Sequence, residues 1–129
     1  MAVELGDVIG KIGGGGGELI TDPLGMTYAG GGFHTLHEFK VTRKSFVAAQ
    51  HDVSRPSATA WGSPLPFIRI TQGGTEVATM TPSSSASNFK EPFRATAVLD
   101  PGTYQVQFDP GGRRTLTVFD LYISVTPIN

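Results

Sequence analysis

The sequence predicts an all-β protein: an antiparallel β-sandwich of jelly-roll or immunoglobulin-like topology with a glycine-rich N-terminal arm. Two observations carry this prediction. From residue 33 onward, short segments alternate apolar and polar side chains with a period of two and are separated by glycine and proline turns, which is typical of half-buried strands. Eleven of the 17 glycines lie in the first 32 residues. We therefore expect an extended arm over residues 1–32 and a sandwich domain over residues 33–129.

The arm is acidic, and it contains the run Gly13–Gly17. Each glycine loses more backbone entropy on ordering than alanine, at a cost of roughly 0.5–1 kcal/mol, so local preference leaves such a run without regular structure. Short apolar side chains punctuate the arm, and we expect them to contact a neighbouring subunit. These partner-binding candidates are Val3, Leu5, Val8, Ile9, Ile12, Leu19, Ile20 and Leu24.

The sandwich domain contains the candidate strands in a regular order. Gly73 and Gly74 supply the positive φ values of a tight hairpin turn. Asp-Pro-Gly at 100–102 and 109–111 marks two further turns, in which we expect each aspartate to cap the turn and Gly102 to adopt a positive φ. No segment has the pattern of an amphipathic helix. Strands are expected over residues 33–42, 45–50, 67–71, 76–80, 93–99, 103–108 and 115–125, with loops over 52–66 and 82–88.

One stretch resembles a known family. The run over residues 66–110 contains the corner Leu99-x-x-Gly102-x-Tyr104, and it resembles the bacterial pre-peptidase C-terminal domain and related carbohydrate-module-like sandwiches. The resemblance implies a β-sandwich in which the Tyr104 hydroxyl bonds to the backbone across a corner. It also implies a secreted module that follows a protease or another enzyme, whereas we expect this chain to have neither a leader nor an attached enzyme.

Composition and motifs point away from catalysis. The chain has no cysteine, which excludes a disulfide scaffold, a thiol nucleophile and a cysteine-ligated zinc. His34 and His37 lie three positions apart in one predicted strand, so we expect them on opposite faces and unable to share a metal ion. With His51 they are expected at the surface or at a strand edge. The sequence has no G-x-S-x-G elbow, D-x-D-x-D loop or P-loop ending. We therefore predict no catalytic, cofactor-binding or metal-binding residue, and no enzyme.

A single tryptophan, Trp61, lies in a Ser-, Ala-, Gly- and Pro-rich loop. It is either a plug beneath that loop or an exposed platform for sugar or protein, on which the loop aromatic Phe89 would join it. The second reading predicts a carbohydrate- or surface-binding module, with a glycan as partner.

The remaining features favour a structural role. The net charge of −1 gives no basic field for nucleic acid or membrane, and no secretory leader or membrane span is found. A cysteine-free sandwich with an adaptable arm is typical of a part assembled in a reducing cytoplasm, and its architecture resembles small phage decoration and fibre proteins. We predict a virion component, such as a capsid decoration (cement) protein or a minor head or tail protein, assembled in the host cytoplasm. Its partners would be virion proteins or copies of itself, with a trimer left open.

Overall fold

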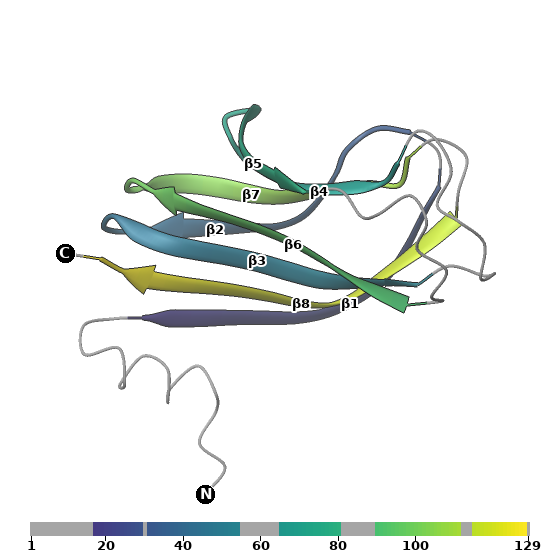
Figure 1. Ribbon diagram of the computed structural model, residues 1–129, viewed down its shortest axis with the longest axis horizontal. Coiled ribbons are helices and arrows are strands. Elements are labelled where there is room, and N and C mark those ends of the chain that lie inside the picture. Colours follow the sequence, from purple (N-terminus) through teal and green to yellow (C-terminus); the bar gives the residue numbers. More distant parts are fainter. Residues whose placement is uncertain (1–16, 30, 55–64, 81–89, 112–114, 129) are drawn as a thin grey trace, which may run out of the picture.

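The computed structural model describes residues 17–29, 31–54, 65–80, 90–111 and 115–128, and every regular element in these ranges is a β-strand. Within them, no helix is long and apolar enough to span a membrane. The strands form two packed layers (Figure 1). In chain order they are β1 (Glu18–Ala29), β2 (His34–Val41), β3 (Ser45–Ser54), β4 (Phe67–Gln72), β5 (Thr75–Met80), β6 (Lys90–Leu99), β7 (Gly102–Asp109) and β8 (Thr115–Pro127).

The pairing of the strands is nested. β1 pairs with β8, β2 with β7, β3 with β6 and β4 with β5, all antiparallel, so the chain is one long hairpin whose tip is the β4–β5 turn. Two further pairings, β3 with β8 and β4 with β7, roll this hairpin into two sheets. Sheet A has the order β1-β8-β3-β6, and sheet B has the order β2-β7-β4-β5. Eight strands rolled in this way form a jelly roll, which is one of the two predicted topologies.

The first strand corrects the predicted division of the chain. Residues 18–29 belong to the predicted arm, yet they form β1 and pair with β8 at the edge of sheet A. Gly25 adopts a φ of 71° where the pairing shifts between Leu24 and Met26, so a residue that suggested an unordered arm marks a bulge in a strand. Within the described residues the sandwich begins at Glu18 and not at residue 33. Residues 1–16, which are half of the predicted arm, lie outside the described residues.

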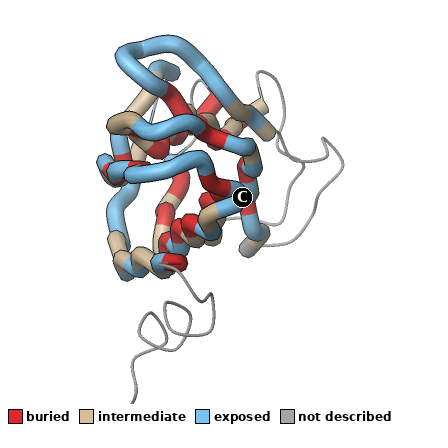
Figure 2. Tube along the Cα trace, turned by 90° about the vertical axis from the view of Figure 1, so that its left-hand side faces the viewer, coloured by how far each residue is buried: buried red, intermediate tan, exposed pale blue. Residues whose placement is uncertain are grey.

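The core lies between the two sheets, where the buried residues gather (Figure 2). All eight strands contribute apolar side chains to it. The strict in-and-out alternation along β7 places its even-numbered residues, Tyr104, Val106 and Phe108, in this layer. The period-two pattern read from the sequence is therefore confirmed for this strand.

The predicted tyrosine corner is confirmed. The Tyr104 hydroxyl donates a 2.6 Å hydrogen bond to the Asp100 carbonyl oxygen. Burial raises the pKa of Tyr104, and the Asp100 carboxylate adds to this effect. The expected positive φ at Gly102 is wrong, because this glycine is not among the residues with left-handed backbone. A Cβ at this position would overlap the side-chain amide of Gln72, but that amide is the end of a flexible, exposed side chain and can move aside.

Two of the predicted turns have the expected geometry. Gly73 and Gly74 have φ values of 57° and 84°, and they join β4 to β5 in a tight hairpin. At the end of β7, the Gly111 backbone N–H donates a 2.8 Å hydrogen bond to Asp109 Oδ1, so this aspartate caps its turn as predicted.

Candidate functional site

The outer surface of sheet B carries a hydrogen-bonded array of polar side chains. In one row, Arg69 Nε donates to Gln107 Oε1 at 2.8 Å, and Gln107 Nε2 donates to Thr35 Oγ1 at 3.0 Å. The backbone register explains the row, because β7 places Gln107 opposite both Thr35 on β2 and Arg69 on β4.

A second row lies two residues along β4 and β7 and, because of a bulge, three residues along β2. Thr71 Oγ1 donates to Gln105 Oε1 at 3.2 Å, and Gln105 Nε2 donates to Glu38 Oε2 at 3.1 Å. In both rows the hydrogen bonds run from β4 through β7 to β2, so the side chains hold one another in a common direction. We call this surface the B face. Its accessible members are Thr35, Glu38, Arg69, Gln105 and Gln107. Thr71, which donates to Gln105, is fully buried.

The Arg69 guanidinium is fixed on more than one side. Its Cζ lies 3.2 Å from the centroid of the Phe33 ring, a cation–π contact. Phe33 in turn meets the edge of Phe67, with the ring centroids 5.0 Å apart. Glu76 of β5 approaches from another direction, with its Oε1 4.0 Å from Arg69 Nη1. The guanidinium is therefore held in place before any ligand arrives.

The B face retains hydrogen-bonding capacity beyond its own array. Gln105 and Gln107 each use one N–H of the side-chain amide in the rows above, and an amide carries two. Glu38 offers a second carboxylate oxygen. Donors and acceptors that alternate at fixed positions can bind a polyhydroxylated molecule, whose hydroxyl groups both donate and accept.

The outer surface of sheet A has a different character. Its register aligns three rows of outward side chains across β3, β6 and β8. In these rows Val98 is 53% exposed, Tyr122 44% and Phe46 40%, although each belongs to a long strand. Among the nine positions, the only side chain with a charge is Arg94. We call this surface the A face. Its rows are Phe46, Val98 and Thr126; Ala48, Thr96 and Ser124; and Gln50, Arg94 and Tyr122.

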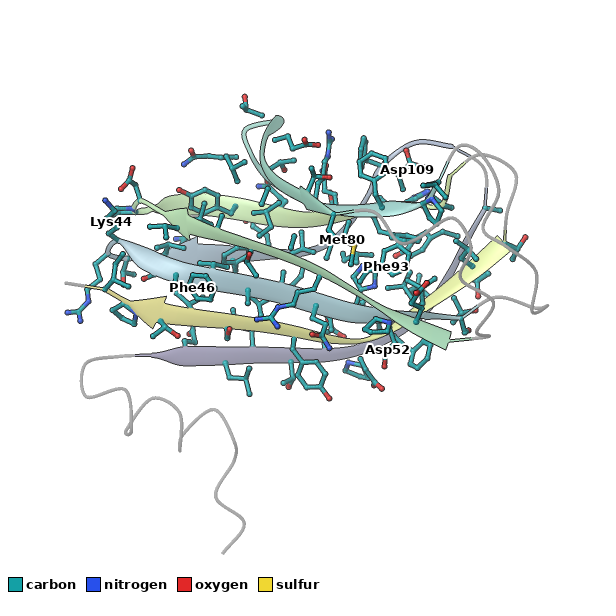
Figure 3. The ribbon with its side chains drawn as sticks, viewed as in Figure 1. Lys44, Phe46, Asp52, Met80, Phe93 and Asp109 are labelled. Carbon is teal, nitrogen blue, oxygen red and sulfur yellow. The ribbon has the colours of Figure 1, made fainter. Side chains whose placement is uncertain are left out.

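The first row of the A face lies near one end of the sandwich. Figure 3 shows Phe46 toward the end at which β8 approaches the C-terminus, away from Phe93 and Asp52. β1 begins at the same end, because Glu18 pairs with Val125 and Thr126 pairs with Phe46. The exposed Phe46 and the entry of the chain into the sandwich are therefore close together.

The structure separates the predicted partner-binding residues into two groups. Ile20 and Leu24 of β1 are partly buried and pack against the core of their own sandwich. Their contact with another subunit stays a prediction. Leu19 is half-buried on the outward side of β1, opposite Ser124. Val3, Leu5, Val8, Ile9 and Ile12, and the possible platform residues Trp61 and Phe89, lie outside the described residues.

The prediction that the histidines lie at the surface is wrong for His51. Its side chain is fully buried between Phe93, whose ring is stacked at 5.7 Å, and the edge of Phe108 at 5.3 Å. Its Nδ1 lies 3.4 Å from the Asp52 carbonyl oxygen. A carbonyl oxygen can only accept, so Nδ1 carries the proton, and Nε2 has no hydrogen-bond partner among the described residues. Burial lowers the pKa of His51 to about 4, against a smaller opposing effect of the bond to Asp52.

The other two histidines correct the expected geometry of β2. A bulge between Thr35 and His37 shifts the alternation by one residue, so His34 and His37 both turn toward β1 instead of lying on opposite faces. The His34 ring stacks on Tyr28 at 4.4 Å, and His37 Nδ1 lies 3.6 Å from Asp22 Oδ2. These contacts close the side of the sandwich where β1 and β2 meet. Among the described residues, no three His, Cys, Asp or Glu side chains gather as a metal site would require.

Neither outer face was identified from the sequence as a site. Gln105 and Gln107 alternate with the buried residues of β7, which indicates an outward polar face, but the partners Thr35 and Arg69 depend on the register of three strands. Likewise, Phe46 and Val98 are far apart in the chain and adjacent only through the pairing of β3 with β6.

Comparison with known proteins identifies the fold. No family model matches the sequence, and no curated protein matches it. The structure is similar to a family 35 carbohydrate-binding module from Clostridium thermocellum, with a TM-score of 0.52 and 15% identity over 82% of this chain and 97% of the module. It is also similar to a chain of infectious bursal disease virus, Gx strain, with a TM-score of 0.52 and 14% identity over 88% of this chain and 34% of the viral one.

A third similar structure is the dimeric latent form of PorU from Porphyromonas gingivalis, with a TM-score of 0.57 and 10% identity. The match covers 84% of this chain and only 12% of PorU. At such identities the likeness concerns the fold alone. It confirms a β-sandwich of the kind seen in carbohydrate-binding modules and other β-rich domains, which is the coarser part of the resemblance stated from the sequence.

Proposed function

We propose that this protein is a non-enzymatic structural component of a virion, such as a capsid decoration (cement) protein or a minor head or tail protein, that binds neighbouring subunits. The observation that carries the proposal is the A face. Phe46, Val98 and Tyr122 are exposed on a long, regular sheet that carries a single charge among nine outward positions. An apolar surface of this kind is typical of a protein interface.

Physical arguments support an assembly role over a solitary one. Burying a phenylalanine or valine side chain stabilises a contact by roughly 1.5–3 kcal/mol, so a partner that covered the A face would gain from both Phe46 and Val98. A sheet with aligned outward residues also offers a flat surface for another subunit. A jelly roll is an architecture of viral capsid domains as well as of lectin domains, which is compatible with the proposal without deciding it.

The cellular setting forms part of the same proposal. The chain has no cysteine, so its stability does not depend on an oxidising compartment. We propose that it assembles into the virion in the host cytoplasm, with virion proteins or copies of itself as partners.

The direct test is to probe density-gradient-purified virus particles from the source culture with an antibody raised against the sandwich. We expect the chain to sediment with the particles and to remain after a high-salt wash, because a mostly apolar interface is little affected by salt. A soluble host protein of similar size is the control. A chain that stays in the soluble fraction with this control would contradict the proposal.

The B face favours a second candidate function, the binding of a saccharide. Its prearranged amides and carboxylate match the chemistry of a polyhydroxylated ligand. Binding at the B face does not require the platform that the sequence predicts at Trp61 and Phe89. Nuclear magnetic resonance titration with a panel of neutral and acidic oligosaccharides tests this candidate. The side-chain amide signals of Gln105 and Gln107 should shift, whereas that of Gln50 on the A face should not. Equal shifts at all three, or none, would contradict it.

A further inference from the structure

The A face and the start of β1 share one end of the sandwich, and this proximity indicates what covers the face. Glu18 pairs with Val125, so the residue before it lies beside Thr126, the β8 member of the first row. Across that row, Phe46 follows on β3 and Val98 on β6. With strands about 4.8 Å apart, Phe46 is about 10 Å and Val98 about 14 Å from the entering chain.

The chain that precedes β1 has the composition to fill such a face. Residues 1–16 contain five large aliphatic side chains, Val3, Leu5, Val8, Ile9 and Ile12. They also contain two acids, Glu4 and Asp7, against one base, Lys11. The single charge within the three rows of the A face has the opposite sign, since it comes from Arg94. Asp52 follows on the same side of β3, beyond these rows. The match between this segment and the A face is therefore chiefly one of apolar character.

Length and direction indicate whose face the segment covers. Sixteen residues can extend over about 50 Å, which exceeds the width of one sheet. β1 runs from this end of the sandwich toward the other end. A segment that precedes β1 and extends along the same line would therefore point away from the three rows of the A face. To cover its own A face the segment would have to reverse direction, whereas a neighbouring copy can present its A face in line.

We propose that the A face, centred on Phe46 and Val98, binds the aliphatic segment of residues 3–12 from a neighbouring copy of the same chain. The inference rests on the proposed function, because it names the surface through which subunits of that assembly are linked. Glu4 or Asp7 of the incoming segment would meet Arg94, and the glycines from Gly13 onward would connect the two copies.

Cysteine cross-linking tests the proposal directly, because the natural chain has no cysteine. One chain carries Ile9→Cys, and a second chain, longer by a tag, carries Val98→Cys. We expect mild oxidation of the mixture to give a disulfide-linked heterodimer that reductant reverses. The matched control replaces Val98→Cys by Lys40→Cys, which is exposed on the outer surface of sheet B. Equal yields with both partners would overturn the proposal.

A chain that carries both Ile9→Cys and Val98→Cys distinguishes the two possible donors of the segment. We expect cross-linked dimers and larger products whose yield rises with protein concentration. A monomeric cross-linked product that dominates at every concentration would show that the segment covers its own face, and it would overturn the assignment to a neighbour.

Sedimentation separates a failure of this inference from a failure of the proposed function. We expect the full chain to associate with rising concentration, and we expect both removal of residues 1–16 and the pair Phe46→Thr and Val98→Thr to weaken association at least about tenfold. Threonine keeps the preference for strand. If only the deletion weakens association, the receptor surface is wrong and the assembly role stands. If the full chain never associates but is found in virus particles, the inference about the A face fails and the proposed function stands. If the chain is also absent from the particles, the inference and the proposed function both fail.

Discussion

The two outer faces of the jelly roll are both surfaces of antiparallel sheets, and they differ in the contacts of their outward side chains. On the B face, Gln105 and Gln107 each bond to a residue on either side, so the polar groups are held by one another. On the A face, Phe46, Val98 and Tyr122 expose apolar surface that no described residue covers. The B face is therefore internally satisfied and ready for a polar ligand, whereas the A face gains stability only when a partner covers it.

This difference shows that the alternation of a strand does not determine what its outward side does. Both faces are carried by strands that alternate inward and outward residues, interrupted on the B face by the bulge in β2, and both lie over the same core. The function of each face depends on which outward residues the register brings into one row. For that reason, perturbations of the two faces are expected to affect different properties.

The largest effect is expected at β1, the edge strand of the sheet that carries the A face. Deletion of residues 1–24 should unfold the protein or cost about 4 kcal/mol or more, because it removes Ile20 and Leu24, and the loss of a packed aliphatic side chain costs roughly 2–5 kcal/mol. Deletion of residues 1–16 ends before β1 and should leave stability within about 0.5 kcal/mol. Urea unfolding followed by circular dichroism measures both. Equal stability of the two deletions would show that β1 is not part of the sandwich.

This first prediction also marks what the sequence could and could not establish. The β4–β5 hairpin, the Tyr104 corner and the Asp109 cap follow from local chemistry, and each was predicted. β1 was missed because Pro23 and Gly25 interrupt its pattern, and only pairing with β8 makes it a strand. The bulge in β2 and the burial of His51 likewise depend on neighbours in space. The two faces required the register of several strands, which residue spacing within one strand does not contain.

The next effect concerns the layer between the faces, where His51 of sheet A packs against Phe108 of sheet B. Its pKa of about 4 lies below the ordinary value of 6.5, so the unfolded chain binds more protons than the folded chain between these pH values. Stability should therefore fall as pH drops from 6.5 to 4, by up to about 3 kcal/mol, since one pH unit of difference in pKa corresponds to about 1.4 kcal/mol.

The variant His51→Leu isolates this contribution. It removes both the titrating group and the unpartnered Nε2, so its free energy of unfolding should lose this part of the pH dependence between 6.5 and 4. Gln50→Leu, which changes a neighbouring side chain of β3 that does not titrate, is the control and should keep the wild-type slope. Parallel pH profiles for wild type and His51→Leu would show that His51 does not titrate as described.

A matched pair of arginines compares the faces more finely. Arg69→Ala on the B face removes the bond to Gln107 and the contact with Phe33, and it should cost about 1–2 kcal/mol. Arg94→Ala on the A face should cost no more than about 0.5 kcal/mol, because that side chain is exposed. Urea denaturation at neutral pH gives both values. Equal losses of free energy of unfolding for the two variants would contradict the contrast between the hydrogen-bonded B face and the uncovered A face.

The smallest effect on stability is expected on the A face itself, and it is the most informative about function. Phe46→Thr should change the free energy of unfolding of the monomer by only about 0.5 kcal/mol, since the side chain is exposed and threonine suits a strand. A thermal melt at a concentration below association should therefore match that of the wild type. If Phe46→Thr instead lowers the melting temperature of the isolated monomer substantially, Phe46 stabilises the fold of the monomer. Its exposure would then no longer support the assignment of this row as an interface.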